Sequence, residues 1–208
     1  MNEFQTRLKK CPLIAILRGI SPEDSIDCTR VLIEEGFGII EIPLNSPRAY
    51  ESIKLVCDYF GRTAIIGAGT VLAKNEVFIL SDIGCRLIVS PNFNSKVTKL
   101  SLEKGMFVIP GVATPTEAFS ALKLNIDGLK LFPAEIILPN ILKAWRAVLP
   151  DNTLLFPVGG ITPEKIRDYK VAGASGFGLG TALFTPEIKV EQLRKNARKF
   201  IKAIGVVH

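Results

Sequence analysis

A lysine inside an apolar segment is the residue of this sequence with the clearest chemical meaning. Lys130 lies in Gly128-Leu129-Lys130-Leu131-Phe132, which has the alternation of a β-strand. Because successive strand side chains point to opposite faces, Leu129 and Leu131 would face outward and Lys130 inward. Burial lowers the pKa of an amine, and the neutral amine can attack a carbonyl to form a Schiff base. The alternative is a structural lysine, paired with a carboxylate or reaching solvent at an open end of the fold.

Glu41 has a similar setting, because Ile40 and Ile42 flank it in another apolar segment. When both isoleucines face outward, the carboxyl group points inward, to the side that Lys130 also faces. Burial would raise the pKa of Glu41 into the range useful for proton transfer, and a nearby ammonium would lower it. The alternative is a Glu41–Lys130 ion pair that only satisfies two buried charges. Such a pair is costly without a function, so the pattern favours a general acid or base.

The elements that must position these residues are short apolar segments, each followed by a stretch of helical periodicity. Their composition predicts eight strands: Leu13–Leu17, Ile39–Ile42, Ala64–Ile66, Leu87–Val89, Phe107–Ile109, Gly128–Phe132, Leu154–Val158 and Gly176–Leu179. Hydroxyl residues before proline predict helix N-termini between them: Ser21, Ser46, Thr114, Thr162 and Thr185.

Strands that alternate with helices predict an α/β fold with parallel strands and crossover helices. A small (β/α)8 barrel (a TIM barrel), formed by one domain over residues 1–208, is favoured over an open doubly wound sheet. A leucine-rich solenoid lacks its repeat signature, and Gly67-Ala68-Gly69 has no third glycine to complete a dinucleotide-binding motif. The sequence leaves open whether the Phe4–Lys10 segment forms a short helix at the bottom of the barrel.

A barrel places its chemistry at the carboxyl ends of its strands. The last two predicted strands end in Gly159-Gly160 and in Gly180-Thr181. Backbone amides at these two exits commonly bind phosphate, although isolated glycine pairs are mostly turns. Arg18, after the first strand, could clamp a carboxylate or be a surface cation. Thr70, after the third strand, could donate a hydrogen bond to the same carboxylate.

The composition excludes several kinds of active site. The one histidine, His208, is the last residue, so Ser-His-Asp or Cys-His catalysis and imidazole metal sites are not expected. The four cysteines, Cys11, Cys28, Cys57 and Cys85, contain no C-x-x-C pair and suit neither zinc nor a disulfide framework. We therefore expect no metal.

No membrane or nucleic-acid partner is expected. No signal peptide or apolar stretch of about 20 residues is present, which predicts a soluble, cytoplasmic protein. The formal net charge is +6, and residues 189–208 contain six basic side chains against one acidic. The apolar positions of this segment have helical spacing, which predicts the last helix of the barrel with a solvated basic face: Leu193, Ala197, Phe200, Ile201 and Ile204. Phe200 is its one aromatic residue, and a nucleic-acid site would interleave several.

Several segments together resemble the class I 2-keto-3-deoxy-6-phosphogluconate and 2-dehydro-3-deoxy-6-phosphogalactonate aldolases, and the resemblance covers almost the whole chain. The matching segments agree with that family in order and spacing: residues 12–20 (PLIAILRGI), 41–47 (EIPLNSP), 67–72 (GAGTVL), 129–133 (LKLFP) and 158–161 (VGGI). Asn45 and Arg18-Gly19-Ile20 look like the galactonate type, whereas Phe132-Pro133-Ala134-Glu135 resembles the gluconate type. The galactonate type is favoured.

This resemblance implies roles for individual residues. Lys130 would be the Schiff-base lysine and Glu41 the general acid and base. Arg18 and Thr70 would hold the carboxylate end of the substrate. Its phosphate would be held by Gly160, Gly180 and Thr181, the last at a position where the family frequently has serine. Members of the family are typically homotrimers and need no cofactor.

The reaction implied is cleavage of 2-dehydro-3-deoxy-6-phosphogalactonate to pyruvate and glyceraldehyde 3-phosphate. The alternative substrates are 2-keto-3-deoxy-6-phosphogluconate and 4-hydroxy-2-oxoglutarate, and the preferred configuration at C4 stays open. A different class of function is a non-catalytic barrel that binds a phosphorylated ligand. In that protein Glu41 and Lys130 would form only an ion pair.

Overall fold

The fold is an alternation of parallel strands and helices, seen in a computed structural model that describes residues 1–205. The strands are β1 Leu13–Ile16, β2 Ile39–Pro43, β3 Ile65–Gly69, β4 Leu87–Val89, β5 Phe107–Ile109, β6 Gly111–Val112, β7 Leu129–Leu131, β8 Leu155–Pro157 and β9 Phe177–Leu179. The helices are α1 Glu3–Lys10, α2 Pro22–Glu34, α3 Ala49–Phe60, α4 Lys74–Asp82, α5 Ser95–Glu103, α6 Pro115–Leu122, α7 Pro139–Arg146, α8 Pro163–Val171 and α9 Val190–Ile204. Each of the eight predicted segments overlaps a strand, although β3 runs three residues beyond the predicted end at Ile66. The short β6 was not predicted.

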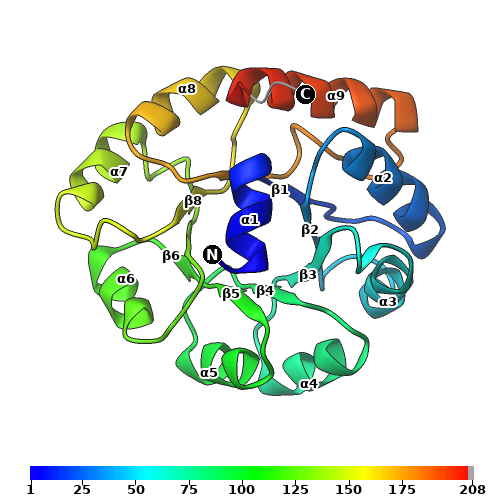
Figure 1. Cartoon of the computed structure of the whole chain (residues 1–208), viewed down its shortest axis with the longest axis horizontal. Helices are drawn as coiled ribbons and strands as arrows, with labels where there is room; N and C mark the ends of the chain where they lie inside the picture. The colour runs from blue at the N-terminus through cyan, green and yellow to red at the C-terminus, as the bar shows by residue number, and fades with distance from the viewer. Residues whose placement is uncertain (206–208) are drawn as a thin grey trace.

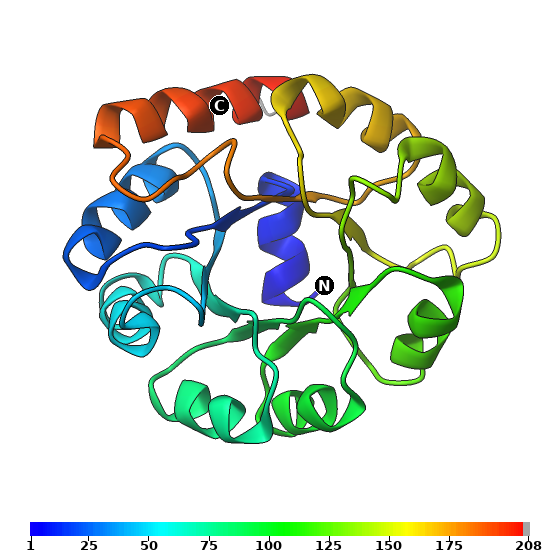
Figure 2. The same ribbon diagram turned by 180° about the vertical axis from the view of Figure 1, so that it is seen from behind.

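The strands curl around a common centre, and α2 to α9 lie outside them (Figures 1 and 2). One sheet has the order β5-β4-β3-β2-β1-β9 and a second has the order β6-β7-β8, with all pairs parallel. Near the junction of the sheets, the Lys130 amide donates to the Pro110 carbonyl at 2.9 Å. At the other junction, a single parallel bridge joins Val158 and Gly178. The predicted α/β class with parallel strands is confirmed.

The two faces of each strand pack into different parts of the core. Ile40 and Ile42 of β2 belong to the larger cluster, which lies between the strands and the outer helices. Ile39 belongs to a smaller cluster inside the ring of strands, together with Phe4 and Leu8 of α1. This alternation is the one that a strand of period two requires when both faces are buried.

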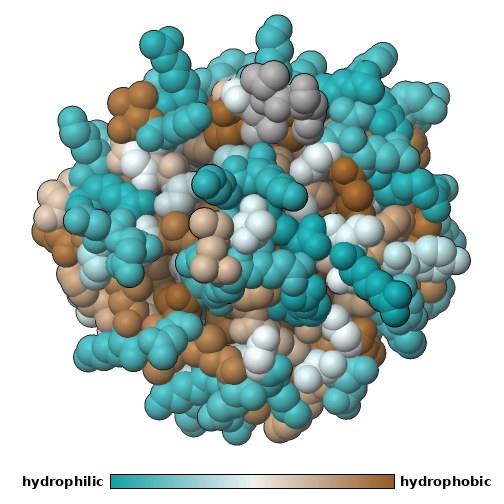
Figure 3. Space-filling view, viewed as in Figure 1, coloured by the Kyte–Doolittle hydropathy of each residue, from teal (hydrophilic) through white to brown (hydrophobic). Residues whose placement is uncertain are grey.

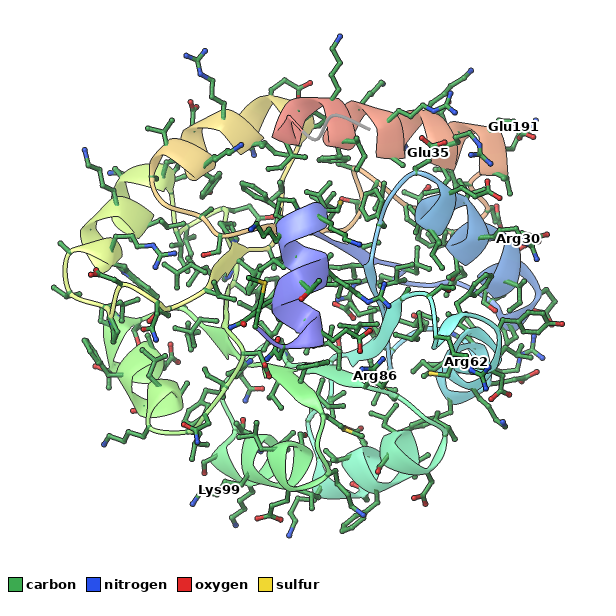
Figure 4. The ribbon with its side chains drawn as sticks, in the orientation of Figure 1. Arg30, Glu35, Arg62, Arg86, Lys99 and Glu191 are labelled. Atoms are coloured by element: carbon green, nitrogen blue, oxygen red, sulfur yellow. The ribbon has the colours of Figure 1, made fainter. Side chains whose placement is uncertain are left out.

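The segment left open by the sequence does form a helix. In α1 the ring of Phe4 is 5.5 Å from that of Phe107 and 6.1 Å from that of Phe156, measured between centroids. The helix lies across one end of the ring of strands (Figure 1). Figure 3 shows this end covered largely by hydrophilic side chains, with apolar patches between them. At its edge, Arg86 forms an ion pair with Glu3 at 2.5 Å, and Figure 4 labels this arginine beside α1.

Two of the predicted helix starts are wrong. Ser21, Thr114 and Thr162 are the N-caps of α2, α6 and α8, as predicted. Ser46 instead accepts a hydrogen bond from the Gly19 amide at 2.9 Å, which ties two strand exits together. The helix α3 starts later, after a left-handed residue at position 48. Thr185 lies on a cavity wall, and α9 begins only at Val190.

The last helix has the predicted apolar positions, all of which are buried. Its basic face is not simply solvated, because Arg194 and Arg198 bind carboxylates of α2 and of the residue that follows it. Arg194 pairs with Glu34 at 2.6 Å and with Glu35 at 2.8 Å, and Arg198 pairs with Glu35 at 2.9 Å. Figure 4 shows Glu35 between α2 and α9. Part of the positive charge of this segment therefore serves to join two neighbouring helices.

Candidate active site

A cavity of about 380 Å³ opens at the carboxyl ends of the strands, opposite the end that α1 covers. Its wall comes from β1 and β7 and from the loops that follow β1, β7, β8 and β9: Ile16, Arg18, Gly19, Lys130, Phe132, Glu135, Val158, Gly159, Gly160, Ile161, Gly180, Thr181, Ala182, Phe184, Thr185 and Pro186. Most of these side chains are apolar. A bound molecule would therefore lose much of its contact with water, and the few polar groups of the wall would contact it directly.

Lys130 is a buried lysine in the wall of this cavity. It lies at the centre of β7, where Leu129 and Leu131 pack into the outer cluster, as the alternation predicted. The lysine is only 3% exposed, yet it reaches the cavity wall, and its Nζ is 4.9 Å from the ring centroid of Phe132. Burial lowers the pKa of Lys130, the charge of Glu41 acts in the opposite direction, and Arg18 lowers the pKa further. At a given pH, a larger fraction of Lys130 is therefore the neutral, nucleophilic amine than in a surface lysine.

Glu41 is buried on the inner face of β2, as the sequence predicted, and is 1% exposed. Burial raises the pKa of Glu41 to about 7, although Lys130 and Arg18 act to lower it. Its Oε2 has no hydrogen-bond partner among the described residues. Over residues 1–205, no ion pair within 4.0 Å joins Glu41 to Lys130. The structural alternative required a direct Glu41–Lys130 ion pair, and these residues do not form one. Near neutral pH the Glu41 carboxyl group can both donate and accept a proton.

Gly69 of β3 gives the Glu41 carboxylate its room. A β-carbon added to Gly69 would lie 1.7 Å from Glu41 Oε2, closer than any real contact. The carboxylate therefore lies directly against the backbone of the neighbouring strand. Its position depends on the absence of a side chain there.

The substitution Gly69→Ala is expected to displace Glu41 and to reduce kcat roughly 10- to 100-fold while the protein stays folded. Gly38→Ala is the matched control. Its new β-carbon would meet Arg7 Cβ at 3.3 Å, far from the cavity. Turnover and thermal melting of the two variants separate the effects. A Gly69→Ala protein with the kcat of the parent would show that the carboxylate position is unimportant.

The proposed phosphate-binding residues come together at the cavity mouth. Gly160 and Gly180 line the wall with Thr181. Gly160 has a left-handed backbone, with φ of 56°, whereas a β-carbon added to Gly180 would meet no atom within 4 Å. The segment after Gly180 forms a turn, in which the amides of Leu183 and Phe184 donate to the Gly180 carbonyl.

The two predicted carboxylate-binding residues have different positions. Arg18 lines the cavity, and its Nη1 donates to Asn45 Oδ1 at 2.6 Å, which fixes one side of the guanidinium. Thr70 is half-buried and is absent from the cavity wall. Its φ of 58° is a left-handed conformation that costs a β-branched residue about 1–3 kcal/mol. Like Glu41, Thr70 is not among the residues that line this cavity, and it follows directly on Gly69, which lies against the Glu41 carboxylate.

Several cavity residues were not predicted from the sequence. Phe132 follows Lys130 by two positions, so strand alternation could have placed its ring on the same face. Glu135 stands in the loop after β7 and lines the cavity beside Gly159 and Gly160. Its place after the predicted strand Gly128–Phe132 is evident from the sequence, but the spacing of the residues assigns it no function. The Arg18–Asn45 contact joins two loops and has no local signal.

The described residues provide neither a metal-binding cluster nor a membrane-spanning helix. Over residues 1–205, no group of three or more His, Cys, Asp or Glu side chains is placed to hold a metal ion. The four cysteines are free. None of the described helices is long and apolar enough to cross a membrane. His208 lies outside the described residues.

Comparison with known proteins identifies the family. A model described as KDPG and KHG aldolase matches residues 4–199. The 2-dehydro-3-deoxy-6-phosphogalactonate aldolase of Escherichia coli (strain K12) is 45% identical over 201 residues, which cover 97% of each chain. This chain belongs to the KDPG and KHG aldolase family. It is therefore a carbon–carbon lyase, as the sequence predicted.

Individual members of the family differ in how similar they are to this chain. The 2-dehydro-3-deoxy-phosphogluconate aldolase of Zymomonas mobilis is 29% identical over 210 residues, covering 98% of this chain and 99% of that one. A solved structure of native KDPGal is 45% identical, with a TM-score of 0.92 over 94% of this chain and 95% of that one. Within the aldolase family, the chain is thus more similar to these galactonate-type relatives, the type that the sequence favoured.

Proposed function

We propose that this protein is a class I aldolase that cleaves 2-dehydro-3-deoxy-6-phosphogalactonate to pyruvate and glyceraldehyde 3-phosphate. The observation that carries the proposal is a buried lysine with a lowered pKa, open to a cavity and not paired with the buried glutamate nearby. An amine in this state suits attack on a ketone. The similarity to a galactonate-type relative supports the substrate.

In the first step, the neutral Nζ of Lys130 attacks the C2 ketone of the sugar acid, and an N–C bond forms. The carbonyl π electrons move to oxygen, which gains a proton, while the nitrogen loses one. Glu41 in its protonated form then gives a proton to the departing hydroxyl, so that water leaves and an iminium remains. A carboxyl group whose pKa is about 7 is suited to this proton transfer near neutral pH.

In the second step, the Glu41 carboxylate takes the proton of the C4 hydroxyl, directly or through a water. The C3–C4 bond breaks, its electron pair moves to form the enamine, and C4 becomes the aldehyde carbon of glyceraldehyde 3-phosphate. Protonation at C3 and hydrolysis of the resulting iminium release pyruvate and free Lys130. The balance of atoms requires no metal or organic cofactor.

Groups in the cavity wall and next to it suit both ends of the substrate. Arg18 and Thr70 are proposed to bind the carboxylate next to C2, Arg18 with its guanidinium held by Asn45. The phosphate would be bound at the mouth by Gly160, Gly180 and Thr181, where small residues let an anion approach backbone amides.

The chain is further proposed to be one closed (β/α)8 domain that forms a homotrimer in the cytoplasm. Hydrogen bonds near both junctions of the sheets support closure. Exposed apolar side chains, such as Phe78 at 46% and Ile136 at 61%, would be buried by association. The four free cysteines fit a reducing compartment.

Reduction with borohydride in the presence of pyruvate tests the Schiff base, and mass spectrometry locates the adduct. The expected result is a stable adduct on Lys130, and its absence would overturn the proposed mechanism. Cleavage rates of the two C4-epimeric phosphorylated acids then test the substrate. Faster cleavage of the galactonate epimer is expected. Faster cleavage of the gluconate epimer would assign the enzyme to the other type, which the Phe132-Pro133-Ala134-Glu135 segment resembles.

A further inference from the structure

The acidic side chain of Glu135 lies where the proposed aldolase would bind the phosphate of its substrate. Glu135 lines the cavity, and its carboxylate lies directly against the Gly159-Gly160 turn. A β-carbon added to Gly159 would be 2.3 Å from Glu135 Oε2, and one added to Gly160 would be 3.0 Å from Oε1. Within residues 1–205, no hydrogen bond or ion pair holds this carboxylate. Its rotation would therefore break no hydrogen bond or ion pair within these residues.

The carboxylate and an incoming phosphate would repel each other. At a separation of about 4 Å in water-like surroundings, one unit of like charge weakens binding about fivefold, and a dianion is affected more strongly. An aldehyde without a phosphate would escape this penalty. Glu135 therefore acts differently on phosphorylated and unphosphorylated molecules that reach the same lysine.

The structure also contains a place to which the carboxylate can withdraw. Glu135 lines a second, shallower pocket beside the first, together with Lys165, Asp168 and Tyr169. The ammonium of Lys165 donates to the Gly160 carbonyl at 2.7 Å, so it stands on the same turn that Glu135 covers. A rotation of the Glu135 side chain into this pocket would bring it towards a cation and uncover the turn.

We propose that Glu135 is a specificity-determining residue that the substrate's phosphate must displace, and that it broadens the substrate class to unphosphorylated hydroxyaldehydes. The inference rests on the proposed aldolase function and deepens it. The side chain weakens binding of the phosphorylated aldehyde and leaves binding of the unphosphorylated one unchanged. The preference of the enzyme for phosphate is thus smaller than its backbone site alone would give.

The variant Glu135→Gln tests this in the condensation direction, with pyruvate and either glyceraldehyde 3-phosphate or glyceraldehyde as acceptor. The ratio of kcat/KM for the phosphorylated over the unphosphorylated acceptor is expected to rise roughly five- to thirtyfold, through a lower KM for the first. Competitive inhibition by inorganic phosphate should strengthen by a similar factor. Glu103→Gln, an exposed carboxylate at the end of α5, is the matched control and should leave the ratio unchanged.

A merely structural Glu135 would lower activity towards both acceptors together. An unchanged or lower ratio in an active Glu135→Gln enzyme would overturn the inference and leave the aldolase function standing. The absence of a pyruvate adduct in the parent enzyme would instead overturn the function itself. Glu135→Ala provides the same comparison if the glutamine variant does not fold.

Discussion

Replacing Lys130 by methionine is expected to abolish aldol cleavage, with a loss in kcat of about 10⁴-fold or more. Methionine preserves the length and apolar stem of lysine but has no nucleophile, so the iminium that accepts the electrons of the C3–C4 bond cannot form. Borohydride with pyruvate should give no adduct on this variant. Binding of substrate at the cavity mouth should survive, because Arg18 and the glycine turn are untouched.

The same variant should fold at least as stably as the parent. Burial lowers the pKa of Lys130 below its ordinary value, so the unfolded chain binds more protons than the folded one up to about pH 10.5. The lysine therefore costs stability at neutral pH, and this cost disappears as pH rises towards that value. Melting at several pH values should show a gain for Lys130→Met that shrinks in alkali. Lys143→Met, on the exposed face of α7, is the control, and cleavage by Lys130→Met within tenfold of the parent would exclude the Schiff-base role.

Glu41→Gln is expected to lower kcat roughly 10²- to 10⁴-fold, the range typical for loss of a general acid or base. Glutamine has the same shape, so it can occupy the space beside Gly69 without transferring protons. The pH profile of kcat/KM provides a second readout. Because the charge of Glu41 raises the pKa of Lys130, its removal should move the remaining acid limb of the profile to lower pH.

Stability gives a third readout for the same variant. The folded pKa of Glu41, about 7, lies above the ordinary 4.5, so the folded chain binds the extra proton between these values. The parent should therefore lose about 3 kcal/mol of unfolding free energy, relative to Glu41→Gln, as pH rises from 4.5 to 7. Glu191→Gln, exposed on α9, should behave as the parent. A Glu41→Gln enzyme with an unaltered pH profile would show that another group moves the protons.

Strand alternation was sufficient to orient the two buried ionisable residues. Apolar neighbours on both sides of Lys130 and of Glu41 left each polar side chain one direction, and the observed clusters have that division. Helix starts were less predictable. A serine before a proline predicts an N-cap from local chemistry alone, yet Ser46 instead binds the Gly19 amide, which belongs to another loop.

The parts of the site that escaped prediction are contacts between separate loops. The Arg18–Asn45 hydrogen bond spans 27 positions, and the contact of Glu135 with Gly159 depends on how two loops leave neighbouring strands. Neither has a period or a cap that sequence spacing can reveal. Thr70 shows a further limit, since its motif predicts a carboxylate ligand, but the left-handed backbone at this position, with φ of 58°, has no signal in the sequence.

The helix α1, with Phe4 and Leu8 packed inside the ring of strands, covers one end of that ring, and within residues 1–205 the cavity opens at the other end. Lys130 lies deep in it, whereas Gly160 and Thr181 lie at the exposed rim. In the proposed reaction, the three-carbon unit bound to Lys130 is therefore the lower layer and the aldehyde phosphate the upper one. The aldehyde must depart first, and water can then reach the iminium to release pyruvate. In the proposed reaction, the product bound deeper in the cavity is thus the one released second.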